Sequence, residues 1–396
     1  MTRAVLTINA GSSSLKFAVY AADGERRRLA AGQLEGIGVH PHLTIRDEAG
    51  HSLLEWRWKE ASRLPAHGEV LSGIIQFLGE NLADLEIVGV GHRVVHGGPI
   101  YEAPVIIDDA VMADLERFQP LAPLHQPHNL TGIRAARAAF ADVPQVACFD
   151  TAFHRRHPWV ADTYGLPYAL WEEGVRRYGF HGLSYEAVWG ILMNRAEHLR
   201  HGRVVVAHLG SGASMCAIRD GVSVGSTMGF STLEGLPMGT RTGSLDPGVV
   251  LWMMQEKGWD AAEITDLLYK KSGLKGLSGV SADMRDLEAS AEPGAKRAID
   301  YFVFRIKREI CAMTSVLGGL DAIVFTGGIG EHSALVRARS TEGLGFLGVA
   351  VDEAANAVNA PVISTADASV EVHVIQTDEE GVIARNTARI VAERAA

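Results

Sequence analysis

Cysteine is scarce in this chain of 396 residues, which has only three. Cys148, Cys216 and Cys311 lie far apart, and no two of them have the C-x-x-C spacing of a thiolate metal site. This pattern argues against a disulfide framework and against a thiolate zinc site, and it fits a reducing compartment. We therefore expect a cytoplasmic protein.

Long hydrophobic runs are also missing. The most apolar stretch, residues 70–90, is interrupted by Glu80, Asn81, Asp84 and Glu86, which a membrane-spanning helix would not tolerate. A strand is predicted almost at the N-terminus, so we expect no signal peptide. These features predict a soluble protein with no membrane partner.

An excess of positive charge is absent as well. The formal net charge of -10 argues against nucleic acid as the main partner. The chain has no G-x-x-x-x-G-K-[ST] segment, so it is not a P-loop protein.

Hydrophobic residues make up 47% and charged residues 21%, as in globular proteins. Because 396 residues exceed one ordinary core, we expect two domains.

Runs of β-forming residues alternate with helical patterns along the chain. This alternation predicts an α/β fold with largely parallel sheets and some hairpins. The predicted strands are residues 3–10, 15–21, 86–96, 145–150, 203–210, 214–221, 322–328 and 371–378. The predicted helices are residues 108–119, 129–140, 183–199 and 295–317.

The two halves of the chain open in a similar way. Residues 6–25, LTINAGSSSLKFAVYAADGE, resemble residues 205–224, VVAHLGSGASMCAIRDGVSV, because each reads as strand, small-residue turn and strand. Glycine and serine are common, so coincidence is the alternative. The matching position in each half favours a duplication, with two related domains facing each other across a cleft.

Three glycine-rich or serine-rich turns, at residues 9–16, around Gly210 and at residues 324–333, offer sites for phosphate. The turn at residues 9–16 combines small residues, hydroxyls and Lys16, which suit a phosphate, although a plain polar loop explains that stretch equally well. The turn at residues 324–333 has three glycines, and we predict a helix from about Glu331. Ser333 occupies the place of the last glycine of a dinucleotide fingerprint, which argues against that site.

Four polar residues stand at positions suited to a functional site. Arg93 is predicted to follow a strand, and Arg241 lies in a loop rich in glycine; a guanidinium there can hold a carboxylate or phosphate, although a surface ion pair is commoner for one such arginine. Asp150 follows an apolar strand, where α/β sheets keep functional carboxylates. His181 precedes a helix predicted to start near Ser184, although a single histidine is usually structural.

Two further clusters invite a metal interpretation. The spacings of His125, His128, His154 and His157 match no standard zinc site, so we do not favour one. The acidic run at residues 378–380 is either a helix N-terminus with favourable dipole charges or a Mg²⁺ site.

Taken together, the motifs resemble the acetate kinase family over essentially the whole chain. They are NAGSSSLKF, GHRVVHGG, APLHQPHNL, FDTAFH, YGFHGLSY, AHLGSGAS, LEGLPMGTRTGSLDPG, SADMRDL, FTGGIGEHS and TDEEGVIAR. The resemblance implies two duplicated actin-like (ribonuclease H-like) domains, residues 1–150 and 151–382, with a nucleotide cleft between them and a C-terminal helix at 383–396 that packs back on the first. It also implies a cytoplasmic homodimer that transfers the γ-phosphoryl of ATP reversibly to acetate, with Mg²⁺ or Mn²⁺, giving acetyl phosphate and ADP.

The resemblance also assigns roles to residues. It implies that His181 and Arg241 stabilise the transition state and that His125 also faces the phosphoryl group. Asp150 matches the catalytic aspartate of the family, which orients the substrate or shuttles a proton. The resemblance implies further that Arg93 binds the acetate carboxylate and that the acyl pocket is formed by Val95, Leu124, Phe180 and Thr232. Magnesium is expected near Asn9 and Glu379. The implied nucleotide contacts are Lys16, His208, Leu209, Gly210, Ser211, Gly212, Asp283, Met284, Arg285, Gly328, Ile329, Gly330, Glu331 and His332.

The chain departs from the family pattern at a few of these motifs. Ser211 and His332 stand where asparagine is common, which bears on nucleotide affinity and base preference. Leu183 and Tyr185 replace threonine and histidine, and Thr232 replaces proline in the acyl pocket. A propionate or butyrate kinase and a nucleotide-binding scaffold without turnover are the alternatives. The scaffold is disfavoured because all the named catalytic groups are retained.

Overall fold

The chain folds into two compact units in a computed structural model that describes residues 1–11, 14–22, 27–36, 41–58, 73–74, 76–77, 80 and 85–395. One unit contains residues 1–153 and 378–396, and the other contains residues 154–377. The second unit is therefore inserted between the body of the first unit and its C-terminal helix.

The first unit is built on a mixed sheet with the strand order β5-β4-β3-β2-β1-β6-β8-β7. The strands β1 to β5 form antiparallel neighbours, whereas β6 lies parallel to β1 and β8 lies parallel to β6. Their bounds are β1 Thr2–Ala10, β2 Ser14–Ala21, β3 Arg28–Glu35, β4 His42–Asp47, β5 Ser52–Arg57, β6 Leu85–Val94, β7 Val105–Ile106 and β8 Gln145–Phe149.

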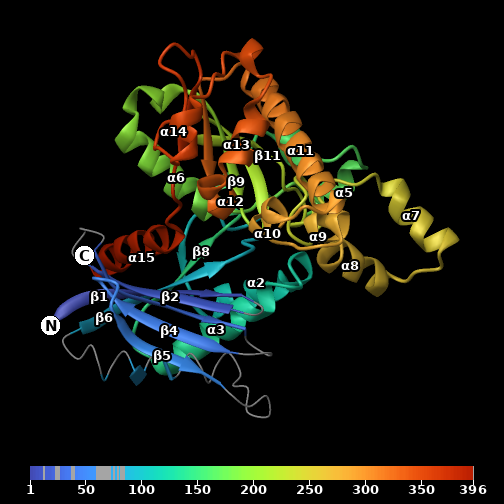
Figure 1. The fold of residues 1–396 in the computed structure, drawn as a ribbon. Helices are drawn as coiled ribbons and strands as arrows, with labels where there is room; N and C mark the ends of the chain where they lie inside the picture. Colours follow the sequence, from blue (N-terminus) through green and yellow to red (C-terminus); the bar gives the residue numbers. More distant parts are fainter. Residues whose placement is uncertain are drawn as a thin grey trace. The chain divides into compact units, whose positions relative to one another are not determined.

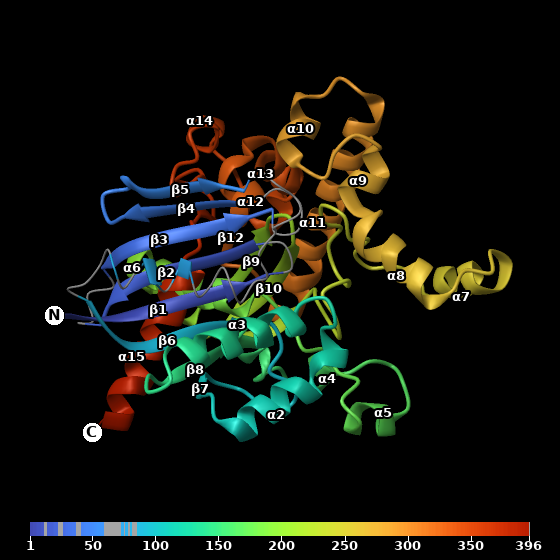
Figure 2. The same ribbon diagram turned by 90° about the horizontal axis from the view of Figure 1, so that it is seen from below.

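Helices cover both faces of this sheet. Helix α3 (Gln126–Ala139) and helix α15 (Glu379–Ala395) both contact β1 and β6, and they lie on opposite faces (Figures 1 and 2). The alternation of side chains along β1 explains this, because Leu6 and Ile8 join the core with Ala136 of α3, while Val5 joins Ala384 of α15. Each strand residue is thus assigned to one helix layer by its parity.

The second unit has a five-stranded sheet with the order β11-β10-β9-β12-β13. Helix α11 (Pro293–Leu317) packs along β9, β10 and β11 with a long apolar stripe, and helix α6 (Gly182–Arg195) contacts β9 (Figure 1). The strands are β9 Arg203–Leu209, β10 Ala213–Arg219, β11 Val222–Ser226, β12 Ala322–Thr326 and β13 Glu371–Val374. The other helices of the two units are α2 Asp109–Arg117, α4 Trp159–Asp162, α5 Tyr168–Glu172, α7 Pro247–Glu256, α8 Ala261–Lys270, α9 Gly273–Ser278, α10 Met284–Ala289, α12 Gly327–His332, α13 Ala334–Thr341 and α14 Glu353–Ala357, with short 3-10 turns at Gln119–Leu121, Ala152–His154, Glu197–His201 and Gly345–Leu347.

The two sheets share one topology, which confirms the predicted duplication and the α/β fold class. The order β3-β2-β1-β6-β8 of the first unit matches β11-β10-β9-β12-β13 of the second. In both, three antiparallel strands are followed by two parallel ones. The first unit adds the edge strands β4, β5 and β7 to this common core.

Several predicted boundaries were wrong. The helix expected from Glu331 begins at Gly327, because the glycines themselves form the first turn directly after β12. Arg93 lies inside β6 rather than after a strand, and the strand predicted over residues 86–96 runs instead from Leu85 to Val94. Helix α6 begins at Gly182 rather than near Ser184. Within the part of the chain that the structure describes, every helix is too short or too polar to cross a bilayer.

Candidate active site

In the first unit, strand parity brings three polar side chains to the face that α15 covers. Asn9 lies four residues after Val5 in β1, so its side chain is on the same face as that of Val5. Lys16 of β2 is paired with Asn9 across the hairpin. Lys16 shares its parity with Ala18 and Tyr20, which pack on the α15 side. In β6, Gly91 faces Thr387 and Ile383 of α15, so Arg93 emerges on the same face.

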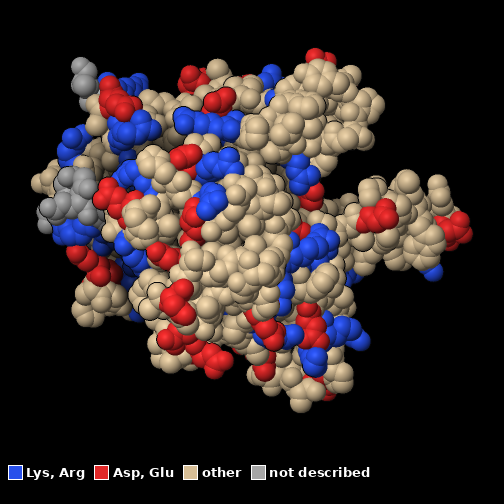
Figure 3. Space-filling model, turned by 90° about the horizontal axis from the view of Figure 1, so that it is seen from above, with Lys and Arg blue, Asp and Glu red and all other residues tan. Residues whose placement is uncertain are grey.

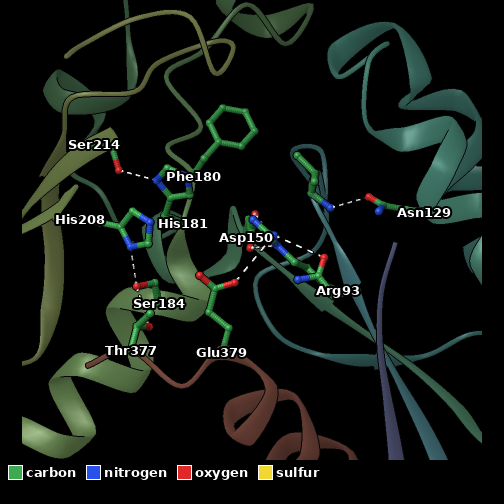
Figure 4. A network of polar contacts seen from close by, with 12 residues as sticks. Arg93, Asn129, Asp150, Phe180, His181, Ser184, His208, Ser214, Thr377 and Glu379 are labelled. Atoms are coloured by element: carbon green, nitrogen blue, oxygen red, sulfur yellow. Dashed lines mark hydrogen bonds and ion pairs between the residues drawn. The ribbon is translucent and has the colours of Figure 1, made fainter. Parts of the chain in front are cut away.

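Arg93 is the centre of a polar cluster in this unit. Its Nη2 donates to Asp150 Oδ2 at 2.7 Å, and its Nε donates to both carboxylate oxygens at 3.1 Å. Its Nη1 lies 3.4 Å from Asn9 Oδ1 and 3.8 Å from Glu379 Oε2 (Figure 4). Asp150 follows β8, and Glu379 is the first residue of α15, so residues from four elements meet at one guanidinium.

Electrostatics explains how the charges in this cluster persist. The Asp150 side chain is 2% exposed and Arg93 is 22% exposed, so both charges are largely removed from water. Burial acts to lower the pKa of Arg93, but the negative charges of Asp150 and Glu379 outweigh it and raise the pKa. At the neighbouring Glu380, burial and the charge of Glu379 raise the carboxyl pKa, whereas Lys16 lowers it.

Asn129 of α3 supports this cluster and was not predicted. Its Oδ1 accepts from the backbone N–H of Val95 at 3.0 Å (Figure 4). Its Nδ2 donates to the carbonyl of Ala10 at 2.8 Å. It therefore fastens the end of β1, which carries Asn9, to the chain just after Arg93. No sequence motif signals such a bond, because its partners are backbone atoms far away in the chain.

The first unit also holds three other predicted residues. Val95 is buried directly after β6, whereas Leu124 and His125 are half-buried. His125 occupies the N-cap position of α3, where its carbonyl accepts from the backbone N–H groups of His128 and Asn129. Ser12 and Ser13 of the first hairpin turn lie outside the described residues.

In the second unit, His181 sits on a tight turn at the start of α6. Its backbone is left-handed, with φ 59°. Its Nδ1 lies 2.8 Å from Ser214 Oγ of β10 (Figure 4). A side chain on Gly212 would come within 3.3 Å of His181 Nε2 and 4.0 Å of Arg241 Nη1, so the bare backbone of the hairpin turn lies against both groups.

His208 joins this group from β9. Its ring stacks on His181 with centroids 4.4 Å apart, and its Nδ1 lies 2.8 Å from Ser184 Oγ. Ser184 in turn lies 2.8 Å from Thr377 Oγ1 (Figure 4). Leu209 is the buried last residue of β9, and Gly210, Ser211 and Gly212 form the turn that follows, with Ser211 exposed.

The predicted acyl residues of this unit flank the same loops. Phe180 is 1% exposed and precedes His181. The backbone carbonyl of Thr232 accepts a hydrogen bond from Arg241 Nη1 at 3.2 Å. Thr232 therefore holds the guanidinium in place, a contact that the sequence did not indicate.

Hydrogen bonds with buried side chains hold the glycine turn after β12 in place. Glu331 Oε1 accepts from Gly327 N at 2.9 Å and from Thr377 N at 3.3 Å. The fully buried Arg337 donates to the carbonyls of Gly330 and Glu331. Gly328 is exposed, Ile329 is half-buried, and the His332 side chain is 74% exposed.

Helix α10 carries the remaining predicted nucleotide contacts. Asp283 caps this helix by accepting from the backbone N–H of Arg285 at 2.9 Å, and it pairs with the Arg285 guanidinium at 2.6 Å. Met284 is buried. Both charged side chains are exposed to solvent, so a ligand can reach this pair.

The structure offers a limited set of metal ligands. Among the residues it describes, no group of three or more histidine, cysteine or acidic side chains is arranged to enclose a metal ion. The oxygens of Asn9, Asp150 and Glu379 around Arg93 are hard donors that suit Mg²⁺, which usually takes few protein ligands and keeps water and phosphate.

Comparison with known proteins identifies the family. A sequence model of the acetokinase family matches residues 4–385. An acetate kinase of Methylocella silvestris is 54% identical, with 100% of both chains covered. A crystal structure of Porphyromonas gingivalis acetate kinase (36% identity, TM-score 0.88) and one of a propionate kinase from Francisella tularensis (35%, TM-score 0.91) each cover 98% of this chain and are themselves covered in full. This chain therefore belongs to the acetokinase family.

Proposed function

We propose that this chain is an acetate kinase, which transfers the γ-phosphoryl group of ATP reversibly to acetate. A carboxylate oxygen of acetate forms a bond to the γ-phosphorus while the bond to the bridging oxygen breaks, and ADP leaves with that electron pair. The products are acetyl phosphate and ADP, formed by direct in-line transfer. The cluster of Asn9, Asp150 and Glu379 around Arg93, in a chain matching the family over its length, carries this proposal.

Arg93 is the proposed carboxylate-binding residue. Asp150 occupies the Nε and Nη2 side of its guanidinium, whereas the contacts at Nη1 are longer, at 3.4 and 3.8 Å. An anionic oxygen from acetate or acetyl phosphate can replace those longer contacts with a charge-assisted bond. Val95 and Leu124, with Phe180 and Thr232 of the second unit, are the proposed surroundings of the methyl group.

His181, Arg241 and His125 are the proposed stabilisers of the phosphoryl group in flight. Such a group spreads negative charge over three equatorial oxygens, so positioning and positively charged or N–H donors dominate catalysis. A carboxylate is already ionised near neutral pH, so no strong base is required. Asp150 is therefore proposed to orient Arg93 rather than to abstract a proton.

The second unit supplies all the proposed nucleotide contacts except Lys16, which lies in the first unit. Lys16 of the first hairpin and the turn from His208 to Gly212 are assigned to the phosphates. The capped start of α10 at Asp283 and Arg285, and the turn from Gly328 to His332, are assigned to adenosine. These assignments are supported by the polar groups that the turns expose and by the buried residues that hold the turns in place.

Magnesium is the proposed metal, with manganese as a substitute. Asn9, Asp150 and Glu379 are the residues that would hold it, directly or through water. When bound, the ion would neutralise charge on the β- and γ-phosphates. Because Glu379 heads α15, that helix would carry the metal ligand into the sheet edge that holds Asn9.

A propionate or butyrate kinase of the same fold is the second candidate. It is favoured by the TM-score of 0.91 to the Francisella tularensis propionate kinase and by Thr232 in the acyl loop. Formation of acyl hydroxamate from ATP, Mg²⁺, hydroxylamine and each of acetate, propionate and butyrate separates the candidates. The proposal predicts the highest kcat/KM with acetate. A higher value with propionate would favour the second candidate, and no product with any acid would indicate a scaffold.

A cytoplasmic homodimer is also proposed. Helix α7 of the second unit exposes Leu251, Trp252 and Met254 to about half their area, and Figure 3 shows this helix as a projecting, sparsely charged surface on the right. A second copy of this chain is the proposed occupant. Leu251→Glu should lower the molar mass in solution towards that of a monomer, whereas Phe346→Glu, on another exposed apolar residue, should not. A monomeric wild type would contradict this proposal.

A further inference from the structure

The catalytic role proposed for His181 depends on which of its nitrogens carries the proton. We propose that Tyr185, acting through Ser214, holds His181 as the neutral imidazole with its proton on Nε2. Tyr185 and Ser214 are positioning residues in this account, since they touch His181 or its partner and not the substrate. The inference rests on the proposed function for its catalytic consequence, but the proton position is a property of the free protein.

A short chain of contacts links the three side chains. Tyr185 Oη lies 2.5 Å from Ser214 Oγ, and Ser214 Oγ lies 2.8 Å from His181 Nδ1. Tyr185 and Ser214 are both fully buried. Tyr185 lies on the first turn of α6 and Ser214 on β10, so the first two of these side chains are held by regular elements.

The direction of the protons follows from donor strength. A serine hydroxyl has one proton to donate and lone pairs to accept with. A phenol is a stronger acid than an alcohol and hence the better donor, so Tyr185 donates to Ser214. Burial, and then the nearby Cys216, raise the pKa of Tyr185 well above its ordinary value, which keeps that proton in place. Ser214 then donates its own proton to Nδ1, which leaves the imidazole proton on Nε2.

The backbone beneath the ring is held by a second buried histidine. His154 Nε2 lies 2.9 Å from the carbonyl of Phe180, and its Nδ1 lies 2.8 Å from Ser223 Oγ. Burial lowers the pKa of His154 to about 4, so it is neutral near pH 7. Its Nε2–H therefore donates to the carbonyl, and Ser223 donates to Nδ1. The turn that carries His181 in its left-handed conformation is thus fixed independently of Ser214.

The proposed proton position is suited to the anion-binding turn. His181 Nε2 and Arg241 Nη1 both lie next to the place that a Cβ atom of residue 212 would occupy, which is empty because this residue is glycine. A proton on Nε2 makes this nitrogen a donor towards a phosphoryl oxygen at that turn. A proton on Nδ1 would instead present a lone pair to the same oxygen and repel it.

Nitrogen NMR of the free protein tests the proton position directly. Long-range ¹H–¹⁵N correlation spectra of protein labelled at histidine distinguish a protonated ring nitrogen from an unprotonated one, and the His181→Gln spectrum assigns the signals. We expect Nε2 of His181 to be protonated and Nδ1 unprotonated in wild type near pH 7.5. In Tyr185→Phe, Ser214 is freed to accept from Nδ1, so the pattern should move towards Nδ1–H. A wild-type Nδ1–H form, or an unchanged pattern in Tyr185→Phe, would overturn the inference.

Kinetics test whether Tyr185 acts through Ser214. Tyr185→Phe should lower kcat about 5- to 10-fold, which is the rate equivalent of one net hydrogen bond, with little change in the KM for acetate. The double variant Tyr185→Phe/Ser214→Ala should be no slower than Ser214→Ala alone. Additive losses would overturn the relay. The control is Tyr101→Phe, which removes a buried phenol bonded to Asp114 in the first unit. A wild type without kinase activity would refute the proposed function but leave the NMR result standing.

Discussion

At the scale of single residues, the two arginines are expected to act at different stages. Arg241→Ala should lower kcat by roughly 10²–10³, because its contact strengthens as charge develops on the phosphoryl group. Arg93→Ala should instead raise the KM for acetate more strongly. Steady-state kinetics check both, with Arg134→Ala as a control, since that arginine forms an exposed ion pair with Glu116. Near-normal turnover in Arg241→Ala would refute its assignment.

His332 is expected to relax the choice of nucleotide base. Its ring is 74% exposed at the end of the glycine turn, so it can stack on a base rather than read its edge. We predict comparable kcat/KM values for ATP, GTP and ITP, and a shift towards ATP in His332→Asn, whose amide donates and accepts. A strict ATP requirement that the substitution leaves unchanged would count against this prediction.

The sequence allowed some residues of the site to be chosen but not their contacts. Asn9, Arg93, Asp150 and Glu379 were selected by motif, and the structure brings them together in one unit. Supporting residues leave no periodic signal, since their partners are distant in the chain. Asn129, Ser214 and the carbonyl of Thr232 are of this kind.

At the scale of elements, Asn129 is expected to hold β1, β6 and α3 in register. Asn129→Ala leaves the buried N–H of Val95 and the carbonyl of Ala10 without this partner, which should lower the free energy of unfolding by about 2–4 kcal/mol. Urea unfolding measures this loss. The matched control is Gln119→Ala, which removes an exposed amide bonded to the carbonyl of Glu116. An equal, small effect in both variants would contradict the role of Asn129.

The predicted elements themselves were mostly right because their signals are local. Runs of β-forming residues at 3–10 and 203–210, and a helical pattern along residues 295–317, correspond to β1, β9 and α11. The start of α12 could not be predicted, because glycine is a poor helix former and the turn is held by Glu331 and Arg337 instead.

At the scale of the whole molecule, stability is expected to fall in mild acid. Burial lowers the pKa of His92 to about 4, while its Nε2 is bonded to Gln145. In the unfolded chain the imidazole of His92 takes up a proton near pH 6.5, whereas in the folded state it stays neutral down to about pH 4. The unfolded state therefore binds more protons in this window, so the free energy of unfolding falls as pH decreases. His92 alone accounts for on the order of 3 kcal/mol.

Urea unfolding of wild type and His92→Gln at several pH values from 7 to 4 checks this linkage. The variant keeps a side chain that can hydrogen-bond but cannot titrate, so its stability should depend less steeply on pH. His51→Gln, at a side chain that is 79% exposed, should leave the slope as in wild type. Equal slopes in wild type and His92→Gln would contradict the prediction.

Transfer of the phosphoryl group to an oxygen of acetate is the central claim, and an oxygen label tests it most directly. The protein is incubated with ATP, Mg²⁺ and acetate labelled with ¹⁸O in both oxygens, and the product is cleaved with hydroxylamine. Hydroxylamine attacks the acyl carbon, so the phosphate released keeps the bridging oxygen. The account predicts that phosphorus NMR shows one ¹⁸O in each phosphate so released. Phosphate without the label, or ATP consumption that does not depend on acetate, would contradict it.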